Sequence, residues 1–212
     1  MKIHWYGHSC CMLTNAAGKR LLMDPFNEKV GYIVPRFEAD VVTVSHSHFD
    51  HSNIDAVKGN YKVFREAGTF TADGFRITGI PSFHDDNGGK DRGSNMIFVV
   101  ESDGYSVCHL GDLGHILPKE TVEMIGRPDV LLLPIGGGYT IDAKKAVEVM
   151  NQLSPRVTVP VHYKTKDCQI KLAELDDFLN VEPTKVVRYV AKEVDIESLL
   201  KTAHVAVMDY GE

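Results

Sequence analysis

The segment from Val41 to His51 constrains the fold of this chain more than any other, because an apolar β run ends there in a cluster of potential metal ligands. The run Val41–Val44 is rich in β-branched residues, which is typical of a strand buried in a sheet. Four side chains that bind cations follow within six residues, namely His46, His48, Asp50 and His51. Chance histidines or a surface metal-trapping patch would lie in a polar tract, whereas this cluster terminates an apolar strand. The segment therefore predicts a metal site at the end of a buried strand.

The spacing of these ligands indicates two cations. Side chains at positions i and i+2 of an extended backbone project to the same side, so His46 and His48 can converge on one ion. Asp50 and His51 lie past the strand and can face a second ion, which in two-metal hydrolytic sites lies about 3.5–4 Å from the first. Four ligands do not complete two metal centres, so the rest of the chain must supply others.

Three further residues fit the same pattern. They are His84, Asp112 and His162, and each comes just after an apolar, strand-like run. Open sheets place their ligand-binding loops at strand ends. Any one of the three could be an ordinary core or loop residue, but the repeated placement favours a set of seven ligands.

Short β-rich runs fill the first half of the chain and alternate with helical patterns in the second half, which predicts an α/β fold. The expected strands are Lys2–Tyr6, Cys10–Thr14, Arg20–Met23, Asp40–Ser45, Gly74–Ile80, Asn95–Glu101, Tyr105–Leu110, Val130–Pro134 and Val157–Val161. The expected helices are Ala143–Leu153 and Ile170–Leu179. No Pro- or Ser-rich linker divides the sequence, so we expect a single domain over residues 1–212.

Composition restricts the partners and the compartment. The formal charge is −6, whereas a protein that binds nucleic acid by neutralising phosphates needs a basic excess. No apolar run reaches the roughly 18 residues of a membrane-spanning helix, and the start of the chain lacks the apolar stretch of a secretory signal. The four cysteines show no C-x-x-C spacing, and reduced thiols are their simplest interpretation, although four cysteines in a secreted protein could pair. We expect a cytoplasmic protein that binds neither nucleic acid nor membrane, while the sequence leaves the oligomeric state open.

The motifs of this chain, taken in order, resemble those of the metallo-β-lactamase superfamily. The H-x-H-x-D-H cluster is followed by a later His, a Gly-Asp and a Pro-Val-His, as in that superfamily. Four segments are similar to its compact branch of metal-dependent hydrolases related to ascorbate-phosphate lactonase, namely Gly7-His8-Ser9, Phe83-His84-Asp85, Gly111-Asp112 and His162-Tyr163-Lys164. The resemblance covers essentially the whole chain. It implies an αβ/βα four-layer sandwich, in which two mixed sheets are flanked by helices.

The resemblance also implies a role for each ligand. Metal one would be held by His46, His48 and His84, metal two by Asp50, His51 and His162, and both by a bridging Asp112. Asp24 resembles an early Asp of the superfamily that orients a ligand imidazole from behind, and a plain turn Asp before Pro25 is the alternative. The best-known β-lactamase subclass has a Cys where this chain has Asp112, which argues against antibiotic hydrolysis. The chain also lacks the helical domain of glyoxalase II and the basic arm of tRNA-processing relatives.

The ligand set indicates hydrolysis of a small-molecule substrate. Imidazole and carboxylate ligands suit zinc, with manganese and iron as alternatives. Two divalent ions flanking a water lower its pKa from about 15.7 towards 7, which supplies a hydroxide nucleophile at neutral pH. The hydroxide would attack an ester, lactone or phosphodiester bond, Asp112 would bridge the metals, and water or Asp50 would protonate the leaving oxygen.

Cationic side chains recur beside the expected ligands and favour an anionic substrate. Lys164 follows His162 by two residues, and Lys90 and Arg92 follow His84 by six and eight. A solvated rim without substrate contact is the plain alternative. The other candidates for contact with a substrate or lid are His8 and His115.

Two other functions stay open as alternatives. One is a mononuclear iron dioxygenase of the same superfamily, and the other is a catalytically silent metal-binding protein. Flavodiiron relatives replace the second His of the cluster with Glu, whereas this chain keeps His48. A silent protein would need a broken ligand set, and all seven positions are filled.

Overall fold

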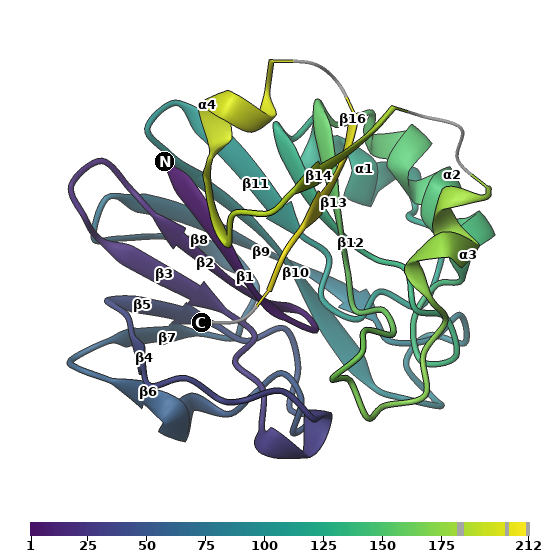
Figure 1. The fold of residues 1–212 in the computed structure, drawn as a ribbon, viewed down its shortest axis with the longest axis horizontal. Coiled ribbons are helices and arrows are strands. Elements are labelled where there is room, and N and C mark those ends of the chain that lie inside the picture. The colour runs from purple at the N-terminus through teal and green to yellow at the C-terminus, as the bar shows by residue number, and fades with distance from the viewer. Residues whose placement is uncertain (182–184, 202–203, 211–212) are drawn as a thin grey trace.

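The computed structural model describes residues 1–181, 185–201 and 204–210, which form two large β-sheets with three of the helices gathered on one side (Figure 1). Both sheets mix parallel and antiparallel strand pairs. The prediction of a mixed α/β fold with two mixed sheets is therefore confirmed.

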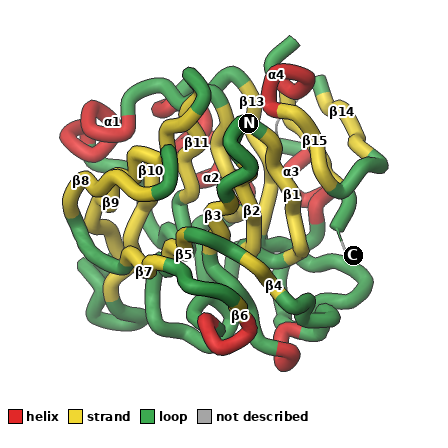
Figure 2. The backbone as a smooth tube through the Cα atoms, turned by 90° about the vertical axis from the view of Figure 1, so that its left-hand side faces the viewer, coloured by secondary structure: helices red, strands yellow, loops and turns green. Residues whose placement is uncertain are grey.

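The smaller of the two large sheets has six strands, and Figure 2 shows three of them, β1, β2 and β3, side by side. In spatial order its strands are β15 (Glu193–Asp195), β1 (Lys2–Gly7), β2 (Cys10–Thr14), β3 (Arg20–Met23), β5 (Val41–Thr43) and β7 (Lys62–Phe64). A separate pair joins β4 (Phe37–Glu38) to β6 (Val57–Lys58).

The larger sheet has eight strands. In spatial order they are β14 (Val186–Tyr189), β16 (His204–Met208), β13 (Val157–Val161), β12 (Val130–Pro134), β11 (Tyr105–His109), β10 (Ser94–Ser102), β9 (Phe75–Phe83) and β8 (Gly68–Ala72). The strands from β14 to β11 are parallel neighbours, so their carboxyl ends lie at one edge of the sheet.

The central strands β2, β3 and β5 of the six-stranded sheet are buried on both faces, because their alternate side chains enter two different apolar cores. Cys11 and Leu13 of β2 belong to the main core, which also contains strands of the larger sheet. Cys10 and Met12 of the same strand belong to a smaller core that includes Phe26 from the segment between β3 and β5. Burial on both faces explains why these strands are continuously apolar.

Helices α1 (Lys119–Ile125), α2 (Ala143–Leu153) and α3 (Leu175–Leu179) lie beside the eight-stranded sheet (Figure 1). The face that α2 buries consists of Ala146, Val149, Met150 and Leu153. The Asp142 carboxylate accepts a hydrogen bond from Lys145 N at 2.9 Å, which caps the start of α2. The remaining short elements are α4 (Ile196–Leu199) and the 3₁₀ turns η1 (Glu28–Val30) and η2 (Ile54–Ala56).

The predicted bounds are confirmed for β2, β3, β12, β13 and α2. The helix predicted over Ile170–Leu179 is wrong in its first half, because α3 begins only at Leu175, after a capping box between Glu174 and Asp177. Strand β9 continues past the predicted end at Ile80 to Phe83, which brings the strand end to His84. The sequence did not predict β7, β8, β14, β15, β16, α1 and α4.

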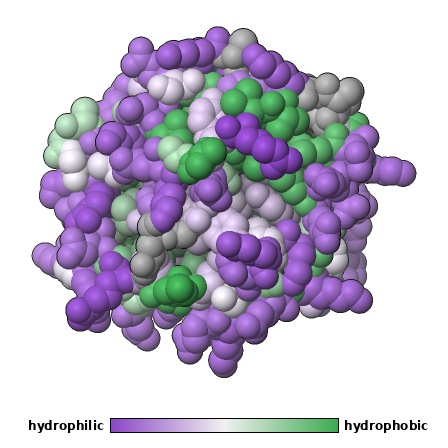
Figure 3. Space-filling model, in the orientation of Figure 1, coloured by the Kyte–Doolittle hydropathy of each residue, from purple (hydrophilic) through white to green (hydrophobic). Residues whose placement is uncertain are grey.

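The surface gives two further observations. None of the helices in the described ranges is long and apolar enough to cross a membrane. The face drawn in Figure 3 is mostly hydrophilic, with small apolar groups between the polar side chains.

Candidate metal centre

Five loops converge on one cluster, and each begins at the end of a strand. His8 follows β1, residues 46–51 follow β5, His84 follows β9, Asp112 follows β11 and His162 follows β13. The seven ligands expected from the sequence therefore lie together. His8, which was expected only as a candidate for substrate contact, joins them.

Asp112 lies at the centre of the cluster, and four imidazoles surround its carboxylate. Its Oδ2 atom lies 3.1 Å from His84 Nε2, 3.3 Å from His162 Nε2 and 3.8 Å from His46 Nε2. Its Oδ1 atom lies 3.2 Å from His51 Nε2. Asp112 is 2% exposed, so the negative charge of this carboxylate is stabilised by the imidazoles and not by water.

The donor atoms form three groups that could each hold a cation, with all atoms of a group within 4.8 Å of one another. The members are His46, His48 and His84 in the first group, His8, Asp50, His51 and His162 in the second, and His46, His51 and Asp112 in the third. The third group shares members with both others. Asp112 therefore belongs to the group that links the other two.

Unpartnered buried atoms test whether these residues fit a metal. Within the described residues, the buried His46 Nε2, His51 Nε2 and Asp112 Oδ1 have no hydrogen-bond partner. A buried polar atom without a partner is costly, and a cation would satisfy all three. Imidazole nitrogen and carboxylate oxygen are also the donor set of zinc. The residues therefore fit divalent metal.

Asp24 sets the orientation of two of the imidazoles from behind. Its Oδ2 atom accepts a hydrogen bond from His51 Nδ1 at 2.8 Å and another from Ser45 Oγ at 2.5 Å. Since the Ser45 hydroxyl donates to Asp24, its oxygen accepts from His46 Nδ1 at 2.9 Å. Both Nδ1 atoms are therefore protonated, so Nε2 is the atom of each ring that is turned towards a cation.

Asn95 and Gly111 position Asp112. The sequence indicated Gly111 only as part of the Gly111-Asp112 motif and gave no indication of Asn95. The Asp112 backbone N–H donates to Asn95 Oδ1 at 2.9 Å, and Asn95 Nδ2 donates to Leu110 O at 2.9 Å. Gly111 has a φ of +56°, and a Cβ there would lie 2.3 Å from Asn95 Oδ1. Only glycine fits this position, and the Gly-Asp pair in the sequence was the available signal.

Three residues of the cluster adopt backbone conformations that L-amino acids rarely take. The φ angles are +51° at His8, +47° at Asp24 and +51° at His162. Each such residue costs on the order of 1–3 kcal/mol and persists only where the surroundings impose it. Here Trp5 Nε1 and the His162 backbone N–H both donate to His8 O, at 3.0 and 2.9 Å.

Burial and charge set the protonation states of the cluster. Burial lowers the pKa of His46 to about 3 and that of His8 to about 4. Burial raises the pKa of the Asp112 carboxyl. The His162 and His51 imidazoles outweigh burial and hold the pKa of Asp112 well below its usual range. Neutral imidazoles and an ionised carboxylate are the forms that bind a cation.

His51 is the exception. Burial lowers its pKa, but the carboxylates of Asp112 and Asp24 outweigh burial and raise the pKa well above the usual value. A cation at His51 Nε2 must displace the proton held there, so metal binding becomes weaker as the pH falls.

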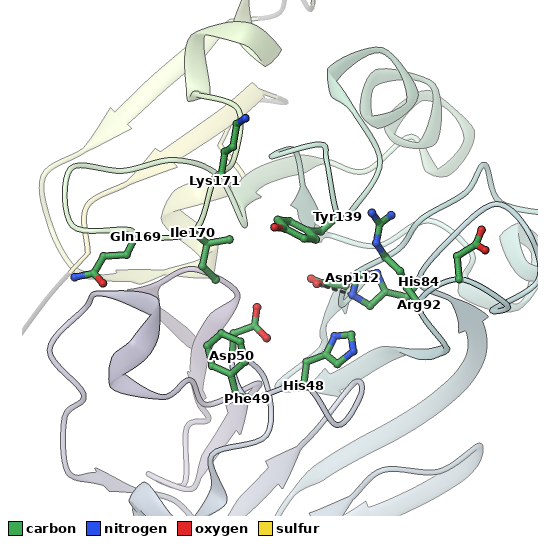
Figure 4. A pocket seen from close by; sticks show the side chains of 11 residues that line it. His48, Phe49, Asp50, His84, Arg92, Asp112, Tyr139, Gln169, Ile170 and Lys171 are labelled. Carbon is green, nitrogen blue, oxygen red and sulfur yellow. Dashed lines mark ion pairs between the residues drawn. The ribbon is translucent and has the colours of Figure 1, made fainter.

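The cluster forms the floor of a cavity of about 660 Å³, shown in Figure 4. His48, Asp50, His84 and Asp112 face this cavity. The other lining residues are Phe49, Asp91, Arg92, Tyr139, Gln169, Ile170 and Lys171. A cavity of this size accommodates a small organic molecule next to the metal ligands.

The structure separates the substrate candidates. Arg92 lines the cavity, whereas Lys164, Lys90 and His115 are not among its lining residues. The Lys164 ammonium donates instead to the backbone oxygen of Cys168. His115 uses both ring nitrogens on the backbone, accepting from Phe83 N at 3.3 Å and donating to Ile116 O at 2.8 Å.

Sequence comparison relates the chain to hydrolases. Residues 2–162 match the family model of the beta-lactamase superfamily domain. A UPF0173 metal-dependent hydrolase of Thermoplasma acidophilum is 32% identical over 194 residues, which cover 79% of this chain and 85% of that protein. A UPF0173 metal-dependent hydrolase of Methanosarcina mazei is 34% identical over 197 residues, with the same 79% and 85% coverage.

Solved structures give the same relationship. A proposed Zn-dependent hydrolase of the metallo-beta-lactamase superfamily from Thermotoga maritima is 41% identical, with a TM-score of 0.83 over 99% of each chain. A metallo hydrolase of the archaeon Ignicoccus hospitalis has 24% identity and a TM-score of 0.72, covering 100% of this chain and 96% of that one. At that lower identity the second likeness concerns the fold alone.

Proposed function

The chain belongs to the beta-lactamase superfamily, and we propose that it uses two metal ions to hydrolyse an ester, lactone or phosphodiester bond of a small molecule. The similarity to these relatives identifies the chain as a metal-dependent hydrolase, and its buried His and Asp cluster is suited to metal binding.

The observation that carries the proposal is the pair of donor groups on either side of the Asp112 carboxylate. Metal one is assigned to His46, His48 and His84, and metal two to Asp50, His51 and His162, with His8 beside the second set. Asp112 bridges the two positions. Zinc suits this nitrogen-rich set best, and manganese or iron can replace it. A mononuclear iron dioxygenase would leave the second group without a role.

When bound, the two cations act as Lewis acids and lower the pKa of water. The residues of the chain supply the other requirements. Asp24 and Ser45 hold the imidazoles of His51 and His46 in their metal-binding tautomers. His8 Nε2 lies 3.1 Å from Asp50 Oδ2 and orients this carboxylate. Asp50 accepts a proton from the attacking water and passes it to the leaving oxygen of the substrate.

A substrate screen tests the function. The protein, stripped of metal and reloaded with zinc or manganese, is assayed on lactones, thioesters and phosphodiesters. We expect hydrolysis of at least one class, loss of turnover after chelation, and recovery on reloading. Oxygen consumption with one iron per chain would support the dioxygenase, and metal binding without any turnover would support the silent protein.

The cysteines support a cytoplasmic location within this proposal. All four lie in described segments, where they are free and buried. Burial raises the pKa of Cys11 and of Cys108, so these thiols are poor nucleophiles. Unpaired thiols of this kind are typical of proteins in a reducing compartment.

A further inference from the structure

We infer that the substrate is an anion with an apolar body and that Arg92 is the residue that recognises its charge. This inference rests on the proposed function, since it concerns the cavity above the same metal ligands. It depends on a rigid loop, on the unpaired guanidinium of Arg92 and on apolar side chains across the cavity.

The loop that carries Arg92 is organised by the Asp85 carboxylate, which is only 5% exposed. Asp85 Oδ1 accepts hydrogen bonds from Asn87 N at 2.9 Å and from Gly89 N at 2.8 Å. Asp85 Oδ2 accepts from Asp91 N at 3.0 Å and from Arg92 N at 2.8 Å. One buried side chain therefore fixes the backbone of the loop, including that of Arg92 itself.

Both ends of this loop are also fastened to the protein. His84 N donates to Gly93 O at 3.1 Å, which closes the loop at its base beside a metal ligand. On its outer side, Lys145 Nζ of α2 lies 3.0 Å from Asp86 Oδ2. The loop is therefore built as a rigid wall of the cavity, and a side chain on a fixed backbone can bind with less loss of entropy.

The Arg92 guanidinium rests on an aromatic ring and has no carboxylate partner. Its Cζ atom lies 5.5 Å from the centre of the Tyr139 ring, a cation–π contact that orients the side chain. Within residues 1–181, 185–201 and 204–210, no Asp or Glu oxygen pairs with it. The donors of the guanidinium are therefore available to a ligand, and their planar fork matches a carboxylate or a phosphate.

Apolar side chains line the cavity across from Arg92. Phe49 is 48% exposed and Tyr139 is 45% exposed, so each ring has surface that a ligand in the cavity can cover. Figure 4 shows Phe49 and Ile170 on the side of the cavity opposite Arg92, with Asp112 and His84 on the same side as Arg92. A substrate with an aryl or alkyl body can lie against this wall, with its anionic end at Arg92 and its scissile bond over the metals.

The other charges of the cavity do not replace Arg92. Asp91 also lines it, but its carboxylate accepts from Asn87 Nδ2 at 3.4 Å and belongs to the loop. The Lys171 side chain points away from the metal ligands in Figure 4. Arg92 is therefore the cation best placed for an anionic group that reaches into the cavity.

Two matched esters test this inference by turnover. Mono-4-nitrophenyl adipate is an anion, and 4-nitrophenyl hexanoate has a methyl group in place of the carboxylate. Loss of a charged hydrogen bond costs about tenfold or more in kcat/KM. We therefore expect Arg92→Gln to lower kcat/KM for the anionic ester by about tenfold and to change that for the neutral ester less than twofold. Arg92→Lys recovers part of the preference.

Two control variants separate recognition from general damage to the loop. Lys90→Gln removes a cation of the same loop that does not line the cavity, and it should keep the preference of the wild type. Asp85→Asn releases the loop and should weaken the preference for the anion with little change in kcat for the neutral ester. A fall in kcat for both esters would show that Asp85 only supports the metal ligand His84.

A binding measurement tests the inference without turnover. We expect the zinc-loaded protein to bind 4-phenylbutanoate at least tenfold more tightly than 4-phenylbutanamide in calorimetry. Arg92→Gln should weaken binding of the acid about tenfold and leave binding of the amide unchanged. If the variant binds the acid as the wild type does, the inference is wrong, whatever the esters show.

The two measurements distinguish the failure of each proposal. Turnover of both esters with no effect of Arg92→Gln overturns the role of Arg92 and leaves the hydrolase intact. If the acid binds in a way that depends on Arg92 but no ester, lactone or phosphodiester is hydrolysed, the proposed function is overturned. The inference that the ligand is an anion with an apolar body is then supported.

Discussion

Asp24 Oδ2 lies 2.8 Å from His51 Nδ1, and this contact fixes the tautomer of an imidazole whose other nitrogen faces Asp112. Both residues are almost completely buried. The same carboxylate reaches His46 through Ser45. A single side chain that contacts no cation position itself thereby prepares a ligand on each side of the centre.

Replacing Asp24 tests this arrangement. Asp24→Asn removes the charge and replaces one acceptor oxygen by an NH₂ group. The side chain then cannot accept both from Ser45 N, as Oδ1 does, and from His51 Nδ1 and Ser45 Oγ, as Oδ2 does, so the two imidazoles lose their fixed orientation. Zinc affinity should fall about 10–100-fold, as is usual when a residue that orients a ligand is changed. Competition with a coloured chelator measures the affinity. Asp176→Asn, at an exposed position of α3, is the control and should bind zinc as the wild type does.

Asp112 should be required for both metals. Asp112→Ala removes the carboxylate that four imidazoles approach, so metal content and turnover should fall together. Metal analysis and the assay on the same preparation check this. A variant that keeps two metals and full activity would show that Asp112 does not bridge them.

Gly111 should be intolerant of any side chain. Gly111→Ala adds a Cβ 2.3 Å from Asn95 Oδ1 at a φ of +56°, so it combines strain with a clash next to Asp112. Gly104→Ala is the matched control, because its φ is +78° and nothing lies within 4 Å of the added atom.

The control should lose about 1–2 kcal/mol of the free energy of unfolding through strain alone. Gly111→Ala should lose more than that and should also bind zinc less tightly. Chemical denaturation of the metal-free proteins measures the first effect. Equal losses in the two variants would mean that the close approach to Asn95 does not matter.

Asp85 should stabilise the protein in a pH-dependent way. Burial raises its pKa, but hydrogen bonds from the backbone of Arg92, Asn87, Gly89 and Asp91 outweigh burial and lower the pKa to about 2. The pKa in the unfolded chain is about 3.9. A carboxylate with a lowered pKa stabilises the folded state above the unfolded pKa, and this contribution is lost as the pH falls through the folded value.

The difference in the free energy of unfolding between the wild type and Asp85→Asn should therefore be constant above about pH 5 and should narrow as the pH falls from about 4 towards 2. Denaturation series at several pH values measure the difference. A difference that stays the same down to about pH 3 would show that the ionised carboxylate is not what holds the loop.

The sequence was most informative where residue type alone restricts the chemistry. Histidines and aspartates that repeatedly end apolar runs are typical of cation binding, so the expected ligand set could be assembled from the sequence. Ser45 and Asn95 could not be recognised in this way, because serine and asparagine occur in every loop and their roles here depend on contacts across the fold.

Proximity in sequence was a poor guide to the substrate wall. Lys164 is two residues from His162, but its side chain turns to the Cys168 carbonyl. Arg92 is eight residues from His84, and the loop held by Asp85 brings it to the cavity. The helix predicted from Ile170 failed because Ile170 lies in a loop, where it lines the cavity and packs against the smaller core.

The number of zinc ions bound per chain tests the central claim most directly. Native mass spectrometry of the protein, stripped of metal and then equilibrated with zinc, counts the ions without any knowledge of the substrate. We predict two zinc ions per wild-type chain. We predict fewer bound zinc ions in His48→Ala and in His162→Ala, whose histidines lie in different donor groups. A wild-type chain that saturates with one zinc ion would contradict the two-metal centre.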